Sequence, residues 1–555
     1  MVQDAARFSE ARLHPMLYDR MNTAPNTQTP RIFSGAPHIA IALPGWSLRE
    51  SLARVLSFYR TSSVVVSQSE VVGDVEKGGV GPDFRISFKS VALSPGSRDG
   101  KTGRRTPQHV VIAPSPVKER RRVQSIGGNA SWWLRFRLWF NTYRKFFTFI
   151  VLLNIVGLTL AIMDVWPYPR NYTDALALGN LLTAILVRNE LFGRFLYLLV
   201  NSLFAKWTPL WFRLGCTSTL QHLGGIHSGC AVSGFAWLIF RVTLIIKHRK
   251  DNPDAMLFIG VVTSVALGIC TASAFPWIRD RHHNVFERHH RFLGWLGLIS
   301  TWVFVILGYC YDTTTRTWNS VAVIVNKQGF WFCLGMTVFI LTPWFTVRKV
   351  KVDVHVPSPK IAIIRFERGM QHGLLSRISR SSIMEYHAFG IVSEGTHAKY
   401  HYLICGVKGD FTRRLVQDPP THLWTRQLKF AGFSNTSSLY RRGIHVCTGS
   451  GIGSALSTCL QNPDWYLIWI GSEQAKTFGP TISGLIRRHI GRERITIWDS
   501  KYQGGRPDTM RIVKEVYASW RAEVVFVTSN SQGNQEIMEG CMEVGIPAFG
   551  TLWDF

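Results

Sequence analysis

Six long apolar stretches between residues 146 and 347 constrain the fold of this chain more than any other feature. Each has about the length that an α-helix needs to cross the hydrocarbon core of a bilayer, roughly 20 residues. The predicted spans are Phe146–Val165, Ala175–Val200, Cys216–Ile246, Met256–Trp277, Phe292–Tyr311 and Gly329–Val347. The alternative, that some of them are core helices of a large soluble domain, is disfavoured because six follow in succession. We therefore expect a six-helix transmembrane domain over residues 126–348, in contact with membrane lipid.

The composition favours a membrane protein over a nucleic-acid-binding protein. The net charge is +28, from 63 Lys and Arg against 35 Asp and Glu, yet only 18% of the residues are charged and 46% are hydrophobic. A soluble nucleic-acid binder of this basicity rarely has so many apolar residues, so nucleic acid is not an expected partner. Basic residues that flank membrane spans and face anionic lipid explain the excess more simply.

The positions of the basic residues predict how the spans are oriented. Basic runs precede the first span, at Lys118–Arg122 and Arg135–Lys145, and Arg348 follows the last span. Because cytoplasmic loops carry the excess of Lys and Arg, both termini of an integral membrane protein with six spans are expected in the cytosol. The basic run Lys247–Lys250 disagrees, because it falls in a loop that this orientation places outside.

The segments before and after the spans have other patterns. Residues 1–125 lack sustained periodicity and are rich in Ser, Pro, Gly and Arg, so we expect a mostly disordered basic region. Residues 349–440 contain short β-like runs separated by Pro and Gly, which predicts a small β-barrel. In residues 441–555 strands alternate with helical stretches, which predicts a parallel α/β domain.

The most informative local motif is a glycine-rich turn that directly follows a predicted strand and opens a predicted helix. Its key residues are Thr448, Gly449, Gly451 and Gly453. Glycines at such a turn let backbone N–H groups approach a pyrophosphate at the helix N-terminus, whose dipole favours the anion. A tight turn without a ligand is the alternative, but the position between a strand and a helix favours dinucleotide binding.

The order of the motifs resembles the ferric reductase and NADPH oxidase superfamily over residues 146–555. After the six spans come Glu385–Phe389, Gly409–Leu415, the glycine-rich turn and Gly505–Asp508. A closer resemblance, to fungal TmpA-type transmembrane flavoproteins, rests on His222–Cys230, His283–Glu287, His290–Trp295 and Gly545–Gly550. The resemblance implies a ferredoxin-reductase-like module, in which an FAD-binding β-barrel precedes an NAD(P)-binding α/β domain.

The resemblance also implies which residues bind the cofactors. His387 and Phe389 match the segment that lines the flavin ring, although Gly390 lacks the hydroxyl usual there. The residues that match the segment for the FAD phosphates are Gly409, Phe411, Thr412 and Arg413; a surface hairpin with ordinary basic residues is the alternative. The nicotinamide dinucleotide would contact Thr448, Gly449, Gly451, Gly453, Gly505 and Arg506. Phe555 would stack over the flavin, unless it belongs to a disordered end.

The histidines decide whether electrons can cross the membrane. Relatives in the superfamily hold two haems with pairs of His about 13 or 14 residues apart on two helices, or about 20 Å along each helix. This chain lacks such pairs, because Phe235 and Val303 stand 13 residues beyond His222 and His290. The remaining candidates are His222, His227, His283 and His290, near the cytosolic ends of two spans, so at most one haem b is expected. The alternative is a metal-free basic cluster that binds lipid headgroups.

These features predict a membrane-bound flavoprotein oxidoreductase that passes electrons from NAD(P)H via FAD to an unidentified acceptor at or in the membrane. Thr528 stands where the superfamily usually has a Cys near the nicotinamide. This departure keeps an alternative open: a degenerate nucleotide-binding scaffold, or a signalling or developmental regulator, without turnover. A six-span channel or transporter has less support, because no transport signature accompanies the dinucleotide-like domain.

Overall fold

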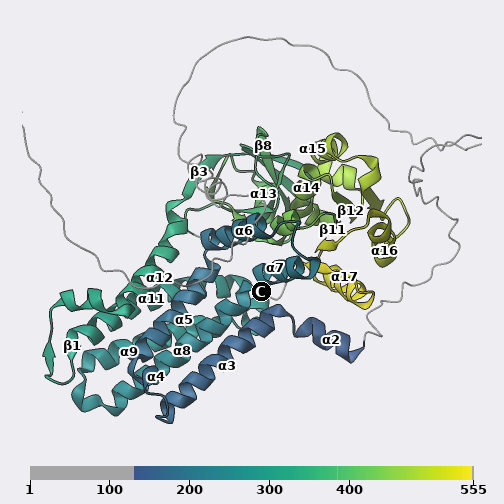
Figure 1. The fold of residues 1–555 in the computed structure, drawn as a ribbon. Helices are drawn as coiled ribbons and strands as arrows, with labels where there is room; N and C mark the ends of the chain where they lie inside the picture. Colours follow the sequence, from purple (N-terminus) through teal and green to yellow (C-terminus); the bar gives the residue numbers. More distant parts are fainter. Residues whose placement is uncertain (1–130, 384–385, 553–555) are drawn as a thin grey trace, which may run out of the picture. The chain divides into compact units, whose positions relative to one another are not determined.

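The computed structural model describes residues 131–383 and 386–552 (Figure 1). The side chains of Asp280, His283 and Asn284 are outside the described part as well. The predictions made for residues 1–125 and for Phe555 therefore lie outside the described residues, as does the side chain of His283.

Six helices run side by side in the first half of the described chain (Figure 1). They are α3 (Thr142–Ile162), α5 (Thr173–Arg188), α8 (Leu223–Lys247), α9 (Asp254–Ser273), α11 (His283–Cys310) and α12 (Gln328–Phe345). By length and composition, five helices among the described residues could cross a membrane, or six if α5 and α6 (Glu190–Phe204) form one bent span. Small residues bring these helices close together: a Cβ at Gly229 would lie 3.1 Å from Ile150 of α3.

The predicted second span, Ala175–Val200, is not one continuous helix. The helix α5 ends at Arg188, and the Asn189 side chain accepts hydrogen bonds from the N–H groups of Leu191 and Phe192. This N-cap starts α6 as a separate helix, bent by 70° from α5. The predicted third span is also divided, because α7 (Leu210–Gln221) ends before His222 and α8 begins only at Leu223.

The starts of α3, α8 and α11 lie at the same end of the helix bundle as the ends of α5, α9 and α12. The Tyr143 hydroxyl near the start of α3 lies 2.6 Å from Ser228 of α8. His227 of α8 contacts the end of α5, and His290 of α11 contacts the end of α9. Trp344, at the end of α12, packs on Trp295 of α11. Helices that follow one another in the chain therefore alternate in direction, and the four predicted haem candidates belong to one end of the bundle.

The β-rich domain follows directly from α12. Its strands are β3 (Val347–Lys351), β4 (Asp353–Ser358), β5 (Ile361–Glu367), β6 (Leu374–Ser379), β7 (His387–Ser393), β8 (Tyr400–Gly406), β9 (His422–Arg426) and β10 (Phe430–Ala431). All pairings are antiparallel, in the order β3-β9-β6-β7-β8-β5-β4, with β10 beside β6. Buried apolar side chains such as Ile364, Leu403 and Leu423 form its core, against which α13 (Asp410–Gln417) packs through Leu415. The predicted β-domain is thus present as an antiparallel sheet.

The last domain is a parallel five-stranded sheet, as predicted. The strands are β11 (Gly443–Thr448), β12 (Trp465–Gly471), β13 (Ile495–Asp499), β14 (Val524–Thr528) and β15 (Ala548–Gly550), in the order β13-β12-β11-β14-β15. The connecting helices are α14 (Ile452–Gln461), α15 (Gln474–His489), α16 (Thr509–Trp520) and α17 (Ser531–Glu543). Because the strand order reverses between β11 and β14, the carboxyl ends of these two strands form the switch point where doubly wound sheets bind ligands.

Helices α6 and α7 form a hairpin, the α6–α7 hairpin, that is held to both later domains by buried polar contacts. Glu190 on α6 pairs with Arg377 of β6 and, at 2.8 Å, with Arg426 of β9. On α7, Arg213 is only 3% exposed and makes a two-pronged ion pair with Glu523, at 2.7 and 3.0 Å. These pairs link the helix bundle to the sheet domains.

Replacing Arg213 with Ala should lower the free energy of unfolding by about 3 kcal/mol, because a half-buried Glu523 carboxylate loses its main partner. Thermal unfolding of the purified full-length protein measures the effect. The matched control is Arg249→Ala, which breaks an exposed pair with Asp254 and should cost less than about 1 kcal/mol. Equal effects of the two substitutions would contradict the importance of the buried pair.

Candidate functional site

The glycine-rich turn lies at the switch point of the parallel sheet. β11 ends at Thr448, residues Gly449–Gly451 form a short 3-10 turn, and α14 begins at Ile452. The backbone of Gly449 has a φ of 50°, and no atom lies within 4 Å of the place where a Cβ would stand. The predicted position between strand and helix is confirmed, and the open side of Gly449 leaves room for a group to approach the backbone.

The other two glycines of the turn are required by packing. A Cβ at Gly451 would lie 2.3 Å from the Thr528 carbonyl oxygen, and one at Gly453 would lie 3.2 Å from Ile404 of β8. Gly451 therefore lets the turn pass close to the end of β14, and Gly453 lets α14 pack on the antiparallel sheet. The sequence pattern alone does not distinguish a glycine that packing requires from a glycine that lets a ligand approach the backbone.

A network of hydroxyl groups connects the ends of β11 and β14, and sequence reasoning missed most of its members. The Thr528 hydroxyl lies 3.2 Å from Nε2 of His445 and accepts a hydrogen bond from Ser454 at 3.3 Å. The hydroxyls of Thr448 and Ser529 are 2.8 Å apart. Burial lowers the pKa of His445 to about 3, so this imidazole is neutral at physiological pH. The signal that could have found these residues is their position at the ends of adjacent parallel strands.

Gly505 and Arg506 lie in the loop after β13, at the same end of the sheet. The indole Nε1 of Trp498 donates a hydrogen bond to the Gly505 carbonyl at 2.9 Å, which ties the loop to the strand. Arg506 is exposed. Because β12 separates β13 from β11, Arg506 and the glycine-rich turn share an end of the sheet without being on neighbouring strands.

The two residues predicted to line a flavin, His387 and Phe389 of β7, lie beside Phe411 of α13, which belongs to the predicted FAD phosphate segment. The rings of His387 and Phe411 are stacked with centroids 4.1 Å apart, and the Phe389 ring lies 6.4 Å from that of Phe411. Gly390 has a packing reason for lacking a hydroxyl: a Cβ there would lie 2.6 Å from the Cα of Ser454. This close contact joins β7 to the start of α14.

The residues predicted to hold FAD phosphates occupy the start of α13. The Thr412 hydroxyl accepts hydrogen bonds from the N–H groups of Lys408 and Gly409 and donates one to the Gly409 carbonyl. It is therefore used within its own turn. Arg413 is more than half exposed and pairs with Asp410 at 3.1 Å, while the Cβ side of Gly409 is open. Of this group, Arg413 and the Gly409 backbone remain accessible to an anion.

Two of the predicted haem candidates face each other between α8 and α11. The rings of His227 and His290 have centroids 6.4 Å apart. Nδ1 of His227 lies 2.9 Å from the Ala184 carbonyl of α5, and Nδ1 of His290 lies 3.1 Å from the Cys270 carbonyl of α9. Each ring is thus oriented by a neighbouring helix through Nδ1, which leaves Nε2 for another partner.

His222 lies apart from this pair. It is buried in the turn between α7 and α8, where Nδ1 lies 2.7 Å from the Ser218 carbonyl of its own turn. His283 belongs to the first turn of α11, and its side chain is outside the described part of the chain. No group of three or more His, Cys, Asp or Glu residues in the described ranges could hold a metal ion, so the site is limited to two protein ligands.

Comparisons with known proteins point to reductases. The profile of the adenylate-forming reductase 03009 C-terminal domain matches residues 433–555. Adenylate-forming reductases 06235 and 03009 of Coprinopsis cinerea are 29% and 28% identical to the chain, over 75% of its length. The chain spans 40% of the length of each of these relatives.

One solved structure with a partial likeness is flavohemoglobin from Malassezia yamatoensis with bound FAD and heme. It is 13% identical, and the match covers 69% of this chain and 97% of that chain with a TM-score of 0.32. A score this low carries no argument about the fold. Neither this structure nor the two relatives are named as ferric reductases or TmpA-type proteins. Both relatives are named reductases, in agreement with the predicted oxidoreductase.

The two sheet domains contain buried histidines, and we therefore expect acid to destabilise these domains. Burial lowers the pKa of His445 to about 3, and that of His372 and His401 to about 4, from the usual 6.5. As the pH falls below 6.5 the unfolded chain binds protons that the folded chain does not, so stability is lost progressively. Each of these three histidines should lower the free energy of unfolding by roughly 2 kcal/mol at pH 5.

The test compares thermal unfolding of the purified protein at pH 7 and pH 5. His445→Gln should reduce the loss of stability between the two pH values, because one buried imidazole is gone. His397→Gln, at an exposed position, is the matched control and should leave the loss unchanged. If both variants behave like the unsubstituted protein, the buried imidazole does not control the acid response.

Proposed function

We propose that the chain is a membrane-bound, NAD(P)H-dependent flavoprotein oxidoreductase. The observation that carries the proposal is the glycine-rich turn at the switch point of a parallel sheet, packed against an antiparallel sheet that presents an aromatic segment. Relatives named as reductases over 75% of the chain support the same reaction class. The narrower resemblance to TmpA-type flavoproteins of the ferric reductase and NADPH oxidase superfamily remains part of this proposal.

The residues present fit an FAD site on the antiparallel sheet. The stacked rings of His387 and Phe411, with Phe389 beside them, offer an aromatic surface for a flavin ring. The open Cβ side of Gly409 and the accessible Arg413 offer a backbone approach and a charge-assisted contact for a phosphate. Bound FAD would supply the capacity to accept a hydride and to release electrons singly.

The NAD(P)H site in this proposal is the carboxyl end of β11 and β14. The open side of Gly449 lets the dinucleotide phosphates approach backbone N–H groups at the start of α14. Arg506, exposed at the same end of the sheet, is placed to meet a nucleotide phosphate. The contact between Gly390 and Ser454 packs the start of α14 against β7, the strand that carries His387 and Phe389.

The pair His227 and His290 fits a haem better than His222 does, because His222 lies apart from both rings. The two imidazole rings lie against each other between α8 and α11, with centroids 6.4 Å apart, and together they would hold the haem iron. The carbonyls of Ala184 and Cys270 would fix both rings through Nδ1. A haem in this place would add one-electron transfer within the helix bundle. This assignment keeps the expected limit of one haem b per chain.

The membrane location and the orientation complete the proposal. The five apolar helices and the bent pair of α5 and α6 would form six spans, and the end of the bundle that bears His227 and His290 would face the cytosol, where α12 leads into β3. The basic loop after α8 would lie on the opposite side, as the alternating helix directions require. The natural electron acceptor would then lie at the inner face or within the membrane.

The nucleotide site can be tested with Gly449→Asn. A substitution at Gly451 is unsuitable, because any Cβ there would meet the Thr528 carbonyl. Asn tolerates the left-handed backbone at Gly449 and fills the open space, so flavin bleaching by NADPH in stopped flow should slow by about tenfold or more. Gly545→Asn is the matched control, with φ 70° and open space but outside the site.

Unchanged bleaching in Gly449→Asn would contradict the assignment of this turn. Absence of bleaching in the unsubstituted, flavin-loaded protein with either NADPH or NADH would favour the scaffold without turnover. In that case the next variant to measure is Thr528→Cys, because Thr528 stands where the superfamily that the chain resembles usually has a Cys.

The haem assignment predicts which histidines matter. His227→Ala and His290→Ala should each remove the haem absorbance and the extractable haem from the purified protein. His222→Ala and His289→Ala are the matched controls, because these imidazoles bond to carbonyls four residues earlier in their own segments. Two haems per chain, or haem loss only in the control variants, would contradict the assignment.

A further inference from the structure

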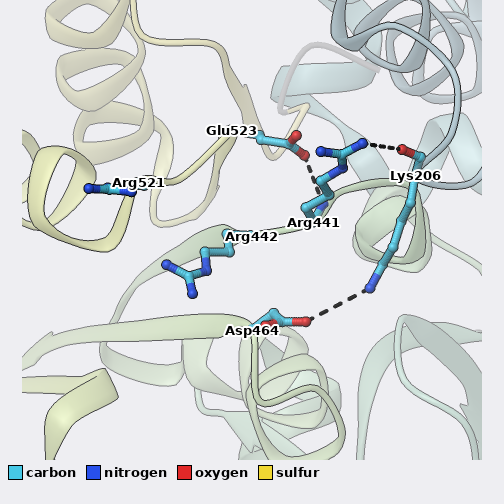
Figure 2. Close-up of a pocket in the computed structure, with 6 residues that line it drawn as sticks. All are labelled: Lys206, Arg441, Arg442, Asp464, Arg521 and Glu523. Atoms are coloured by element: carbon cyan, nitrogen blue, oxygen red, sulfur yellow. Dashed lines mark hydrogen bonds and ion pairs between the residues drawn. The ribbon is translucent and has the colours of Figure 1, made fainter.

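A pocket of about 440 Å³ lies at the amino ends of the parallel strands, away from the glycine-rich turn (Figure 2). The residues that line it come from segments leading into three strands and from the turn between α6 and α7. They are Arg441 and Arg442 before β11, Asp464 before β12, Arg521 and Glu523 before β14, and Lys206. Because the amino and carboxyl ends of parallel strands are opposite, this pocket is separate from the proposed NAD(P)H site.

The charges around the pocket are not balanced. Four of the six lining residues are basic and two are acidic. Glu523 is already engaged by the guanidinium of Arg213 and by the N–H of Arg441, and Asp464 lies 3.8 Å from Lys206. Within the described residues, neither Arg442 nor Arg521 has an ion pair with a carboxylate. The pocket therefore has an excess of positive charge that a bound anion would neutralise.

Two of the four basic side chains, those of Arg441 and Arg442, are held in position by contacts with neighbouring residues. The Arg442 guanidinium lies over the Trp520 ring, 5.4 Å from its centroid, and donates to the Trp520 carbonyl at 3.4 Å. The Arg441 guanidinium donates to the Lys206 carbonyl at 3.4 Å, as Figure 2 shows. These contacts reduce the side-chain entropy that binding an anion would otherwise cost.

Two of the basic residues have a backbone conformation that glycine adopts without strain. Lys206 has a φ of 46° and Arg521 a φ of 52°, both in the left-handed region that side chains disfavour. Each follows a helix end, where glycine is the common residue. The chain thus keeps a cationic side chain at two strained positions of the same pocket, which points to a use for those side chains.

We propose that this pocket binds a phosphate group. A phosphomonoester carries up to two negative charges and several acceptor oxygens, which matches the two arginines without carboxylate partners. The phosphate belongs either to a soluble small molecule or to a lipid headgroup. The second source is included because Leu203 and Trp207, on either side of Lys206, are 38% and 74% exposed and offer apolar surface beside the pocket.

The test uses the full-length protein in detergent, with inorganic pyrophosphate as the probe and calorimetry as the measurement. Saturating NADPH is present throughout, so that the glycine-rich turn is filled and cannot contribute. Arg521→Gly should weaken binding by about tenfold or more, since one charge-assisted contact is lost, while thermal stability is kept because glycine relaxes the backbone. Lys206→Gly should act in the same way.

The matched control is Arg316→Gly, which removes a basic residue at a φ of 55° in the turn between β1 (Tyr311–Asp312) and β2 (Thr317–Trp318). It should leave pyrophosphate binding unchanged. A second titration uses dioctanoyl phosphatidylinositol 4-phosphate and distinguishes the two sources of the phosphate. If this lipid binds more tightly than pyrophosphate and Arg521→Gly abolishes its binding, the ligand is a lipid headgroup. If the lipid binds as tightly as pyrophosphate or more weakly, the ligand is a soluble phosphate. No saturable binding of either probe at millimolar concentration, or an equal loss in Arg316→Gly, overturns the proposal.

Discussion

The ion pairs of the α6–α7 hairpin are the interactions on which the rest of the structure depends. At one end Glu190 is paired with Arg377 and Arg426 of the antiparallel sheet, and at the other Arg213 is paired with Glu523 of the parallel sheet. Buried pairs of this kind gain little over apolar packing, but they are strongly directional and costly to break. They fix both sheet domains to the end of the bundle that holds His227 and His290. The proposed electron path requires that arrangement.

A short series of aromatic contacts continues from this junction. Tyr386, next to His387 on the antiparallel sheet, packs edge-on against Trp344 at 6.1 Å, and Trp344 packs against Trp295 of α11 at 5.7 Å. Arg426 lies over the rings of both Tyr386 and Trp344, so the residue that anchors Glu190 also orders these rings. The α6–α7 hairpin and the aromatic contacts therefore both connect the antiparallel sheet to the helix bundle.

Much of the fold could be predicted from the sequence, because apolar length and strand periodicity are local signals. The glycine-rich turn was placed correctly between β11 and α14 for the same reason. The contact of Glu190 with the antiparallel sheet could not be predicted, since Arg377 lies 187 positions further along the chain and Arg426 lies further still. Spacing also could not choose between His222 and His227, because that choice depends on α8 starting at Leu223 and on the carbonyl of Ala184. Similarly, the absence of a hydroxyl at Gly390 reflects its contact with Ser454, which no local pattern reveals.

The central claim is that one flavin and one haem in this chain share electrons that enter from NAD(P)H. An anaerobic titration of the purified full-length protein with NADPH, followed by visible absorbance, tests it most directly. The account predicts an uptake of about three electrons per chain, two at the flavin and one at the haem, with both chromophores reduced in the same titration. A chain that binds both groups but takes up only two electrons, with the haem left oxidised, would contradict the account.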